Sequence, residues 1–366
     1  MNARAVAILV VLLAALGGGA LLVRQQSGSQ QPAQSASLGQ PLFKGLQAAE
    51  VASVVIRQPK AAITIARKDE RWTIAERGGF PADFDKVRDF VLKAIALKIS
   101  QAEPIGEKDR ARLELDAGGT AVEFLGADGK PLARLTVGRK FFKSAPENPD
   151  KAIGDGRYVA LPGDEQRVYV VADPLTQASA RSADWISKAG IGADQIKSLD
   201  VQYPEGAAGA KGAASGPSWR VERTGDNADW KLAGARADEK LELTKANAAV
   251  YTFGQIEIAD VAPPGARPEA AGLDRPAVVT ASTFDGLTYV LKLGKSEGDN
   301  VYASVAVAGE PKAEGKDAEE RQKKLAERLA RERALAGHIV LIPKQKLDDI
   351  VRKRADLLAK KEEKKK

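Results

Sequence analysis

The sequence predicts an α+β protein: a tandem duplication of a mostly antiparallel β-sheet unit with one covering helix, preceded by a single N-terminal transmembrane helix. Two observations lead to this fold class. The stretch ASVVIRQP at 52–59 recurs as KSLDVQYP at 197–204, and the elements after each stretch come in the same order. A charge-free apolar run also stands near the N-terminus, which is typical of a membrane-spanning helix.

The N-terminal apolar run, Ala5–Val23, is nineteen residues long and is followed by Arg24. As a helix it would span roughly 28 Å, close to the thickness of a bilayer core. We expect residues 1–24 to be a retained anchor in the bacterial cytoplasmic membrane, with the bulk of the chain on the extracytoplasmic side. A signal peptide cleaved near Gly18-x-Ala20 is the alternative.

Residues 25–41 are rich in Gln, Ser, Ala and Pro and have no apolar period. This composition predicts a flexible tether between the membrane segment and the folded part of the chain.

The first repeat is expected over 42–172. The strand at 52–59 is followed by two strands joined by a charged turn, and the second of these carries Trp72. A helix capped by Asp83 follows and leads into a short strand that ends at Pro104. The helix is predicted from apolar residues at helical spacing on one face, namely Phe84, Val87, Val91 and Ile95.

The second repeat, over 195–351, has the same order of elements, and Trp230 takes the place of Trp72. Its helix is predicted from Leu243, Ala246, Val250 and Phe253. Each repeat then has an Asp-Gly turn between two apolar runs, which is the strongest short-range hairpin signal; the turns are Asp128-Gly129 and Asp285-Gly286. In both repeats the second hairpin strand is expected to end at a glycine before a basic residue, and two more strands complete the sheet.

Between the repeats, residues 173–194 are expected to form a helical connector with Trp185 packed at the junction. Equivalent positions in two repeats are typical of core anchors, so Trp72 and Trp230 are expected to serve structure. Together with Trp185 they are the candidates for packing between the repeats.

The two repeats differ at the join between their last two strands. The first repeat uses the tight turn 162–165, whereas the second has an insertion at 310–337 that contains a strong helix former, AEERQKKLAERLARERALAG. One interpretation is a solvated helix at a hairpin tip. The other is a partner-docking element, with the candidate residues Leu325, Arg328, Leu329, Arg331 and Leu335.

The net charge of +7 comes from one end of the chain, since residues 312–366 hold 18 Lys and Arg against 11 Asp and Glu. A nucleic-acid-binding protein usually spreads its basic residues over a folded face, so we expect no nucleic-acid partner. The basic tail, 352–366, is expected to be solvated and frayed; contact with acidic lipid headgroups or a partner is the alternative.

Sequence patterns that carry catalytic chemistry were not found. The chain has no cysteine and one histidine, His338, which excludes thiolate chemistry and a histidine metal cluster. It also has no GxSxG elbow, no Walker loop and no GxGxxG that opens a helix. We therefore expect a protein that is not an enzyme and has no catalytic, cofactor-binding or metal-binding residues.

Several stretches resemble a bacterial family, the domain of unknown function numbered 4340. They are LFKGLQAAEVASVVI at 42–56, RWTI at 71–74, GGFPADFDKVRDFV at 78–91, DGRYVAL at 155–161 and ADWISKAGI at 183–191. The resemblance implies a single-span, envelope-exposed protein of a kind often encoded beside ABC-2-type export systems, some similar to those of gliding motility. It implies an accessory role beside an ABC permease and ATPase, and it supplies no catalytic residues.

Three functions remain open at this point. The first is a membrane-anchored, non-enzymatic accessory or scaffold protein that works with an ABC-type transport system. The second is a binding module for envelope glycan or lipid. The third and least favoured is an envelope hydrolase, which would need two acids that converge in a cleft.

Overall fold

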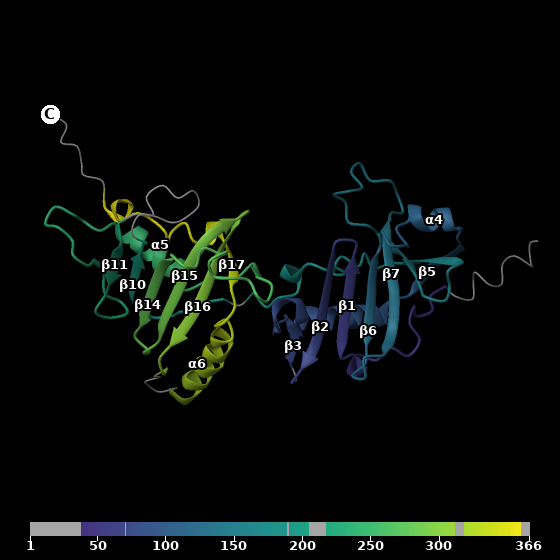
Figure 1. Cartoon of the computed structure of the whole chain (residues 1–366), viewed down its shortest axis with the longest axis horizontal. Helices are drawn as coiled ribbons and strands as arrows, with labels where there is room; N and C mark the ends of the chain where they lie inside the picture. Colours follow the sequence, from purple (N-terminus) through teal and green to yellow (C-terminus); the bar gives the residue numbers. More distant parts are fainter. Residues whose placement is uncertain (1–37, 70, 189, 205–216, 312–317, 360–366) are drawn as a thin grey trace, which may run out of the picture. The chain divides into compact units, whose positions relative to one another are not determined.

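The computed structural model describes residues 38–359 except 70, 189, 205–216 and 312–317 (Figure 1). The predicted membrane anchor and most of the predicted tether lie outside these residues. In the described part of the chain, no helix is both long and apolar enough to cross a membrane. Residues 39–41 already belong to the folded part, because Gly39 N donates to Ile99 O and Ile99 N donates to Gln40 O.

The chain divides into two compact units. The first comprises the residues up to Trp72 together with Phe84–Asp184, and the second comprises Thr73–Asp83 together with the residues from Trp185 onward. The predicted repeat boundaries did not foresee that the short segment Thr73–Asp83 belongs with the second half of the chain. Each unit is built on a mostly antiparallel sheet, as the sequence predicted.

The first sheet has nine strands in the order β4-β3-β2-β1-β6-β7-β8-β9-β5. Its strands are β1 (Ser53–Gln58), β2 (Ala61–Lys68), β3 (Arg71–Ile74), β4 (Phe80–Pro81), β5 (Ile99–Pro104), β6 (Thr120–Leu125), β7 (Pro131–Phe141), β8 (Gly156–Ala160) and β9 (Arg167–Val171). A short helix, α4 (Glu107–Arg112), connects β5 to β6, and single 3-10 turns, η1 (Ala48–Glu50) and η2 (Ala75–Arg77), flank the first strands.

The first unit packs one helix, α3 (Phe84–Ala96), on its sheet through Val87, Phe90, Val91 and Ala94. The rings of Phe90 and Phe124 lie 5.8 Å apart in this layer. Phe84 was predicted on the same face but is 58% exposed. The buried stripe lies at positions 87, 90, 91 and 94, which leaves Phe84 at the helix start beside the guanidinium of Arg88.

The second sheet has eight strands in the order β12-β11-β10-β14-β15-β16-β17-β13. They are β10 (Ile196–Gln202), β11 (Trp219–Glu222), β12 (Lys231–Leu232), β13 (Asp260–Val261), β14 (Ala277–Thr283), β15 (Thr288–Glu297), β16 (Asn300–Ala308) and β17 (Val340–Pro343). Helix α5 (Leu243–Phe253) packs on it through Ala246, Ala249 and Phe253. A sixteen-residue helix, α6 (Ala318–Arg333), lies between β16 and β17 (Figure 1).

The two sheets have the same topology. When the strands are matched in chain order, β3-β2-β1-β6-β7-β8-β9-β5 corresponds strand for strand to β12-β11-β10-β14-β15-β16-β17-β13, and β4 is the extra strand of the first sheet. Identical order through eight strands, with a covering helix at the same place in the chain, confirms the predicted duplication.

The glycines that were expected to end the hairpin strands, Gly138 and Gly294, lie inside β7 and β15. Both strands shift register there against the next strand, which is typical of a β-bulge. A Cβ at Gly138 would lie 2.2 Å from Leu113 O, and one at Gly294 would lie 2.1 Å from Ala271 O. Glycine is therefore needed for a passing loop to approach the strand, and the strand continues beyond it.

Two predictions at the margins of the repeats were wrong. The connector 173–194 is not helical apart from one 3-10 turn, η3 (Ser182–Asp184), because its backbone pairs with neighbouring segments, for example Ile191 N with Ile256 O. The tail is not frayed at 352–359. Those residues include a 3-10 turn, η5 (Arg354–Leu357), with Leu357 fully buried.

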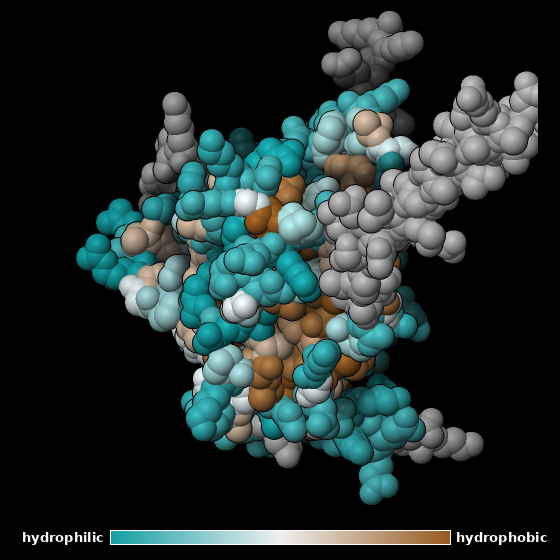
Figure 2. Space-filling model, turned by 90° about the vertical axis from the view of Figure 1, so that its right-hand side faces the viewer, coloured by the Kyte–Doolittle hydropathy of each residue, from teal (hydrophilic) through white to brown (hydrophobic). Residues whose placement is uncertain are grey.

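Apolar side chains are not confined to the layer under α3. A smaller cluster of the first unit consists of Leu115, Ala160 and Val168, with Ile105, Leu113 and Tyr158 packed against it. On the face of the molecule that Figure 2 shows, brown apolar side chains are visible between teal hydrophilic ones.

Candidate functional site

The described part of the chain contains no candidate metal site, and its histidine is engaged in packing. No group of three or more His, Asp or Glu side chains there is arranged to hold a metal ion. His338 packs edge-on against Phe80, with ring centres 5.2 Å apart, and burial lowers the pKa of its imidazole. His338 is therefore a structural residue, and the polar groups around α6 form the candidate site.

Helix α6 packs against its own unit through one face. Leu329 and Leu335 are 4% and 3% exposed, and Leu325 and Arg328 are half-buried, whereas Arg331 is exposed. The expectation of a solvated helix is correct for most of α6, because eleven of its sixteen residues are exposed, and it is wrong only for this one face. The small number of apolar residues in the sequence predicted a solvated helix. The buried face is completed by a charged residue, Glu332. Of the candidate docking residues, Arg331 is the one that presents its side chain to solvent.

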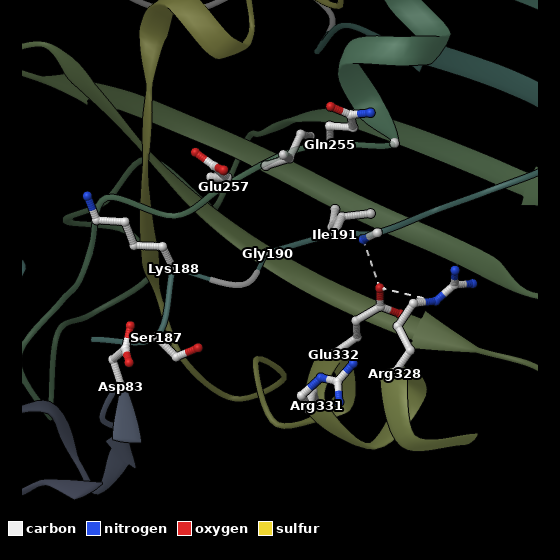
Figure 3. A pocket seen from close by; sticks show the side chains of 13 residues that line it. Asp83, Ser187, Lys188, Gly190, Ile191, Gln255, Glu257, Arg328, Arg331 and Glu332 are labelled. Atoms are coloured by element: carbon white, nitrogen blue, oxygen red, sulfur yellow. Dashed lines mark hydrogen bonds and ion pairs between the residues drawn. The ribbon is translucent and has the colours of Figure 1, made fainter. Parts of the chain in front are cut away.

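Glu332 is 3% exposed and ties α6 to two other segments. Its carboxylate accepts a hydrogen bond from Gly192 N at 2.8 Å (Figure 3) and another from the Tyr289 hydroxyl at 3.0 Å. Tyr289 comes from β15, and Gly192 precedes β10. Burial raises the pKa of the Glu332 carboxyl above its ordinary value, although these hydrogen bonds and Arg328 act in the opposite direction.

Arg328, one turn before Glu332, is the cation of the same cluster. Its guanidinium pairs with Asp194 at 2.7 Å and lies 3.8 Å from both Asp285 and Glu332. Asp285 is itself buried and accepts a hydrogen bond from Thr283 Oγ1. The Nε of Arg328 is buried without a hydrogen-bond partner in the described structure. Three carboxylates thus surround one guanidinium, which holds the end of α6 on the sheet.

A pocket of about 610 Å³ lies beside this cluster. Its walls come from four parts of the second unit: Asp83 at the end of the segment Thr73–Asp83, the segment before β10, the turn after α5 and the end of α6 (Figure 3). The lining residues are Asp83, Ser187, Lys188, Gly190, Ile191, Gly192, Gly254, Gln255, Ile256, Glu257, Arg328, Arg331 and Glu332. The lining combines polar and apolar atoms and has no aromatic side chain among its described residues.

The acids and bases of this pocket differ in their partners. Glu332 is bonded as described above, Glu257 lies 3.7 Å from Lys346, and Asp83 is also engaged. Lys188 and Arg331 make no ion pair or hydrogen bond with any described residue. The positive charges of the pocket are therefore less compensated than the negative ones.

The first unit has no counterpart of this cluster. When Gly138 is matched with Gly294, Ala133 stands in the place of Tyr289, and the turn 162–165 stands in the place of α6. The larger pockets of the first unit, about 500 and 420 Å³, share Arg157. Arg157 donates to the carbonyls of Pro174 and Gly138, so its role is structural.

Comparison with protein-family models finds one match, the domain of unknown function DUF4340, over residues 72–276. This range covers more than half of the 366 residues. The chain belongs to the DUF4340 family. The comparison with curated proteins found no match, and neither did the comparison with solved structures.

The DUF4340 match ends just before β14, so it includes the pocket wall from Asp83 to Glu257 but not α6. The matched range therefore includes the segments that face α6, and it does not extend to the helix that completes the cluster. The resemblance predicted from the sequence is confirmed at the level of the family.

The tryptophans predicted to pack between the repeats have different surroundings. Trp185 is fully buried in the second unit, whereas Trp72 is half-buried in the first. Trp230 is buried and donates to Asn247 Oδ1 at 3.0 Å, with the guanidinium of Arg223 4.7 Å from its ring centre. Trp230 thus serves the second unit itself, and a role of these residues between the repeats stays a prediction.

The sequence indicated Arg328 of the cluster and Arg331 of the pocket lining, but not Glu332, Tyr289 or Gly192. One signal could have found them. A polar insertion that occurs in one repeat only should be matched by a polar residue on the neighbouring strand of that repeat, and Tyr289 in the place of Ala133 is such a residue.

Proposed function

We propose that this chain is a non-enzymatic accessory protein of the bacterial envelope, held at the cytoplasmic membrane by residues 5–23 and working beside an ABC-type permease and ATPase. The observation that carries the proposal is the contrast between the units: they share one topology, but the second alone is extended by α6. Helical insertions at loop tips often carry function. A membrane anchor would concentrate the body near its partner, so that weak contacts suffice.

The exposed face of α6 is the proposed contact surface. It carries charged residues that point away from the buried face, among them Lys323, Lys324 and Glu327. Leu329 and Leu335, the apolar residues first considered for docking, are buried within the second unit and are not accessible to a partner. A partner would therefore meet a charged helix surface, and its binding would weaken with salt.

A module for envelope glycan or lipid is the second candidate. The pocket beside Glu332 supports it by its volume, which falls in the range of small-molecule sites. Its lining disfavours glycan, because sugar rings commonly stack on aromatic side chains and the described lining has none.

The test is affinity capture of the full chain from its native membrane with a tag after Lys366, followed by mass spectrometry. Deleting 310–337 is unsuitable, because it removes Leu329, Glu332 and Leu335 from the interior. The variant is instead Lys323→Glu with Lys324→Glu, and the matched control is Lys44→Glu on the first unit, also exposed.

We expect a permease and an ATPase to be recovered in stoichiometric amounts with the native chain and the control, and to be lost with the α6 variant. Recovery of the native chain alone, with its N-terminal segment intact, would overturn the stable-complex proposal. Equal recovery by the α6 variant and the control would overturn the proposed contact surface.

A further inference from the structure

The pocket beside Glu332 has two cationic side chains that make no ion pair or hydrogen bond with a described residue, although Arg331 interacts with Glu332 at longer range. Lys188 comes from the segment before β10, and Arg331 comes from the last turn of α6. The dipole of α6 favours a cation at its C-terminal end, which accounts for Arg331. It does not account for Lys188, which belongs to a different segment of the wall (Figure 3).

The acids of the same wall are already engaged. Glu332 accepts two hydrogen bonds, and Glu257 lies near Lys346. An anion that enters the pocket would therefore meet carboxylates that already have close partners, and two cations that have no ion pair or hydrogen bond with a described residue. Burial also raises the pKa of Glu332, which reduces the cost of a second negative charge nearby.

We propose that this pocket binds a small organic anion that carries phosphate or carboxylate, with Lys188 and Arg331 as its charged contacts. The pocket of about 610 Å³ is much larger than a single phosphate ion needs and matches sites for small molecules. Guanidinium and ammonium groups bind phosphate and carboxylate by charge-assisted hydrogen bonds. The inference rests on the pocket and not on the proposed transport partner.

Two sources could supply this chemistry: the headgroup of an anionic phospholipid and a free solute. The experiment separates them with water-soluble probes. Glycerol phosphate stands for the lipid headgroup, citrate stands for a free carboxylate solute, and uncharged glycerol is the control. Binding to the full chain, held in phosphatidylcholine nanodiscs, is measured by isothermal titration calorimetry at low and at physiological ionic strength.

Three variants test the contacts. Lys188→Gln and Arg331→Gln each remove one charge from the pocket, and Lys323→Gln removes one from the exposed face of α6 outside it. All three side chains are exposed. The variants are therefore expected to have the same midpoint temperature of unfolding as the native chain, which a thermal unfolding experiment verifies. Arg331→Lys restores the charge without the guanidinium.

We expect saturable binding of at least one anion, no binding of glycerol, and weaker binding at higher salt. Each pocket variant should bind about tenfold more weakly, which corresponds to one lost charged contact. Lys323→Gln should bind as the native chain does, and Arg331→Lys should recover most of the affinity. Preference for glycerol phosphate assigns the site to phosphate, and preference for citrate assigns it to carboxylate. A phosphate site whose binding of glycerol phosphate is lost when the nanodiscs contain phosphatidylglycerol is a lipid-headgroup site, and one whose binding is retained is a solute site.

Two results would overturn the proposal. One is no saturable binding of either anion at millimolar concentration. The other is binding that both pocket variants leave unchanged, since the anion would then lie elsewhere on the chain. Neither result bears on capture of a permease through α6, so the two proposals fail independently.

Discussion

At the residue scale, the second unit is distinguished by a buried carboxylate. Glu332 replaces the apolar residue that a packed helix would normally place on its inner face, and it is paired with a hydroxyl, a backbone amide and a nearby guanidinium. A buried charge is costly unless all of these groups are in place. The cluster therefore specifies where α6 lies more than it stabilises the unit.

Removing the carboxylate of Glu332 should destabilise the folded state. Glu332→Ala leaves the Gly192 amide and the Tyr289 hydroxyl without their acceptor, so we expect the free energy of unfolding to fall by about 3 kcal/mol. Glu332→Gln retains an acceptor oxygen and should cost about 1 kcal/mol. Urea unfolding measures both. The control, Glu327→Ala on the exposed side of α6, should change stability by less than about 0.5 kcal/mol.

The same carboxyl should make stability depend on pH. Because burial raises the native pKa of Glu332 above its unfolded value, the folded state binds this proton more tightly than the unfolded state does. The group's contribution is therefore fully present below the unfolded pKa and is lost as the pH rises through the native pKa.

Urea unfolding of the native chain and of Glu332→Gln at a series of pH values measures this contribution as a difference. We expect the native chain to lose stability relative to the variant as the pH rises from the ordinary carboxyl range, about 4.3. If the native chain instead gained stability relative to Glu332→Gln as the pH rises, the raised pKa of Glu332 would be contradicted. Tyr289, Arg328, Arg331, Asp194 and Asp285 surround the group and are retained in both proteins.

At the element scale, the bulge is the feature that both repeats share most closely. Leu113 O accepts from Arg139 N beside Gly138, and Ala271 O accepts from Lys295 N beside Gly294, both at 2.9 Å. A loop carbonyl thus occupies the space of the missing side chain in each unit. The glycine before a basic residue, visible twice in the sequence, marks this approach and not the end of a strand.

Alanine at either bulge should be strongly destabilising. Because the new Cβ would overlap a backbone oxygen, Gly138→Ala and Gly294→Ala should each cost more than about 3 kcal/mol. The control is Gly225→Ala, where nothing lies within 4 Å of the new Cβ. Thermal unfolding compares the three variants. If Gly225→Ala and Gly138→Ala lowered stability equally, the close approach of the loop carbonyl to the strand would not constrain the fold.

The C-terminal segment is the second element-scale feature. The Tyr203 hydroxyl and Trp219 Nε1 both donate to Arg352 O, at 2.8 and 2.7 Å, and burial raises the pKa of Tyr203 to about 12. Two donors on one carbonyl hold the chain where it leaves the sheet. This explains why 352–359 is ordered although its composition predicted a frayed tail.

Tyr203→Phe removes one of these donors. We expect a loss of about 1 kcal/mol, together with faster amide exchange confined to 352–359, measured by hydrogen exchange and mass spectrometry. Tyr251→Phe is the matched control, because Tyr251 is 67% exposed on α5. Unchanged exchange at 352–359 would mean that Trp219 alone secures the segment.

At the scale of the whole molecule, the duplication is not a simple division of the chain into halves. The segment Thr73–Asp83 comes from the first half of the sequence but is part of the second unit. There it pairs Ala82 with Ile186, places Arg77 3.4 Å from Asp260 and packs Phe80 on His338. The second unit is thus incomplete without eleven residues that precede it by about a hundred positions.

Phe80→Ala tests this assignment. The side chain is 2% exposed, so its loss should cost about 3–5 kcal/mol. Hydrogen exchange should show the loss of protection in the second unit, at β13 and β17, while α3 and β6 of the first unit keep theirs. Phe80→Leu is the volume-conserving control and should retain most of the protection. Loss of protection restricted to the first unit would contradict the division.

The sequence by itself determined the elements and their order. Strand periods, two Asp-Gly turns and a repeated series of motifs depend on residues within about ten positions of each other, and such local patterns survive without knowledge of the fold. The α+β class follows from these patterns, and the DUF4340 family follows from the resemblance of particular stretches and from the family-model match. The position of the insertion between the last two strands of the second repeat was also visible, because the repeats could be compared directly.

Only the tertiary structure decided which residues meet. Gly192 and Glu332 are 140 positions apart, and Arg77 and Asp260 are 183 apart, so no local pattern connects them. A charged residue is predicted to face solvent when no partner is known, because a charge is tolerated inside a protein only when it is paired. For that reason α6 was expected to be solvated, and the pocket formed by α6 and the segments that face it became visible only in the folded chain.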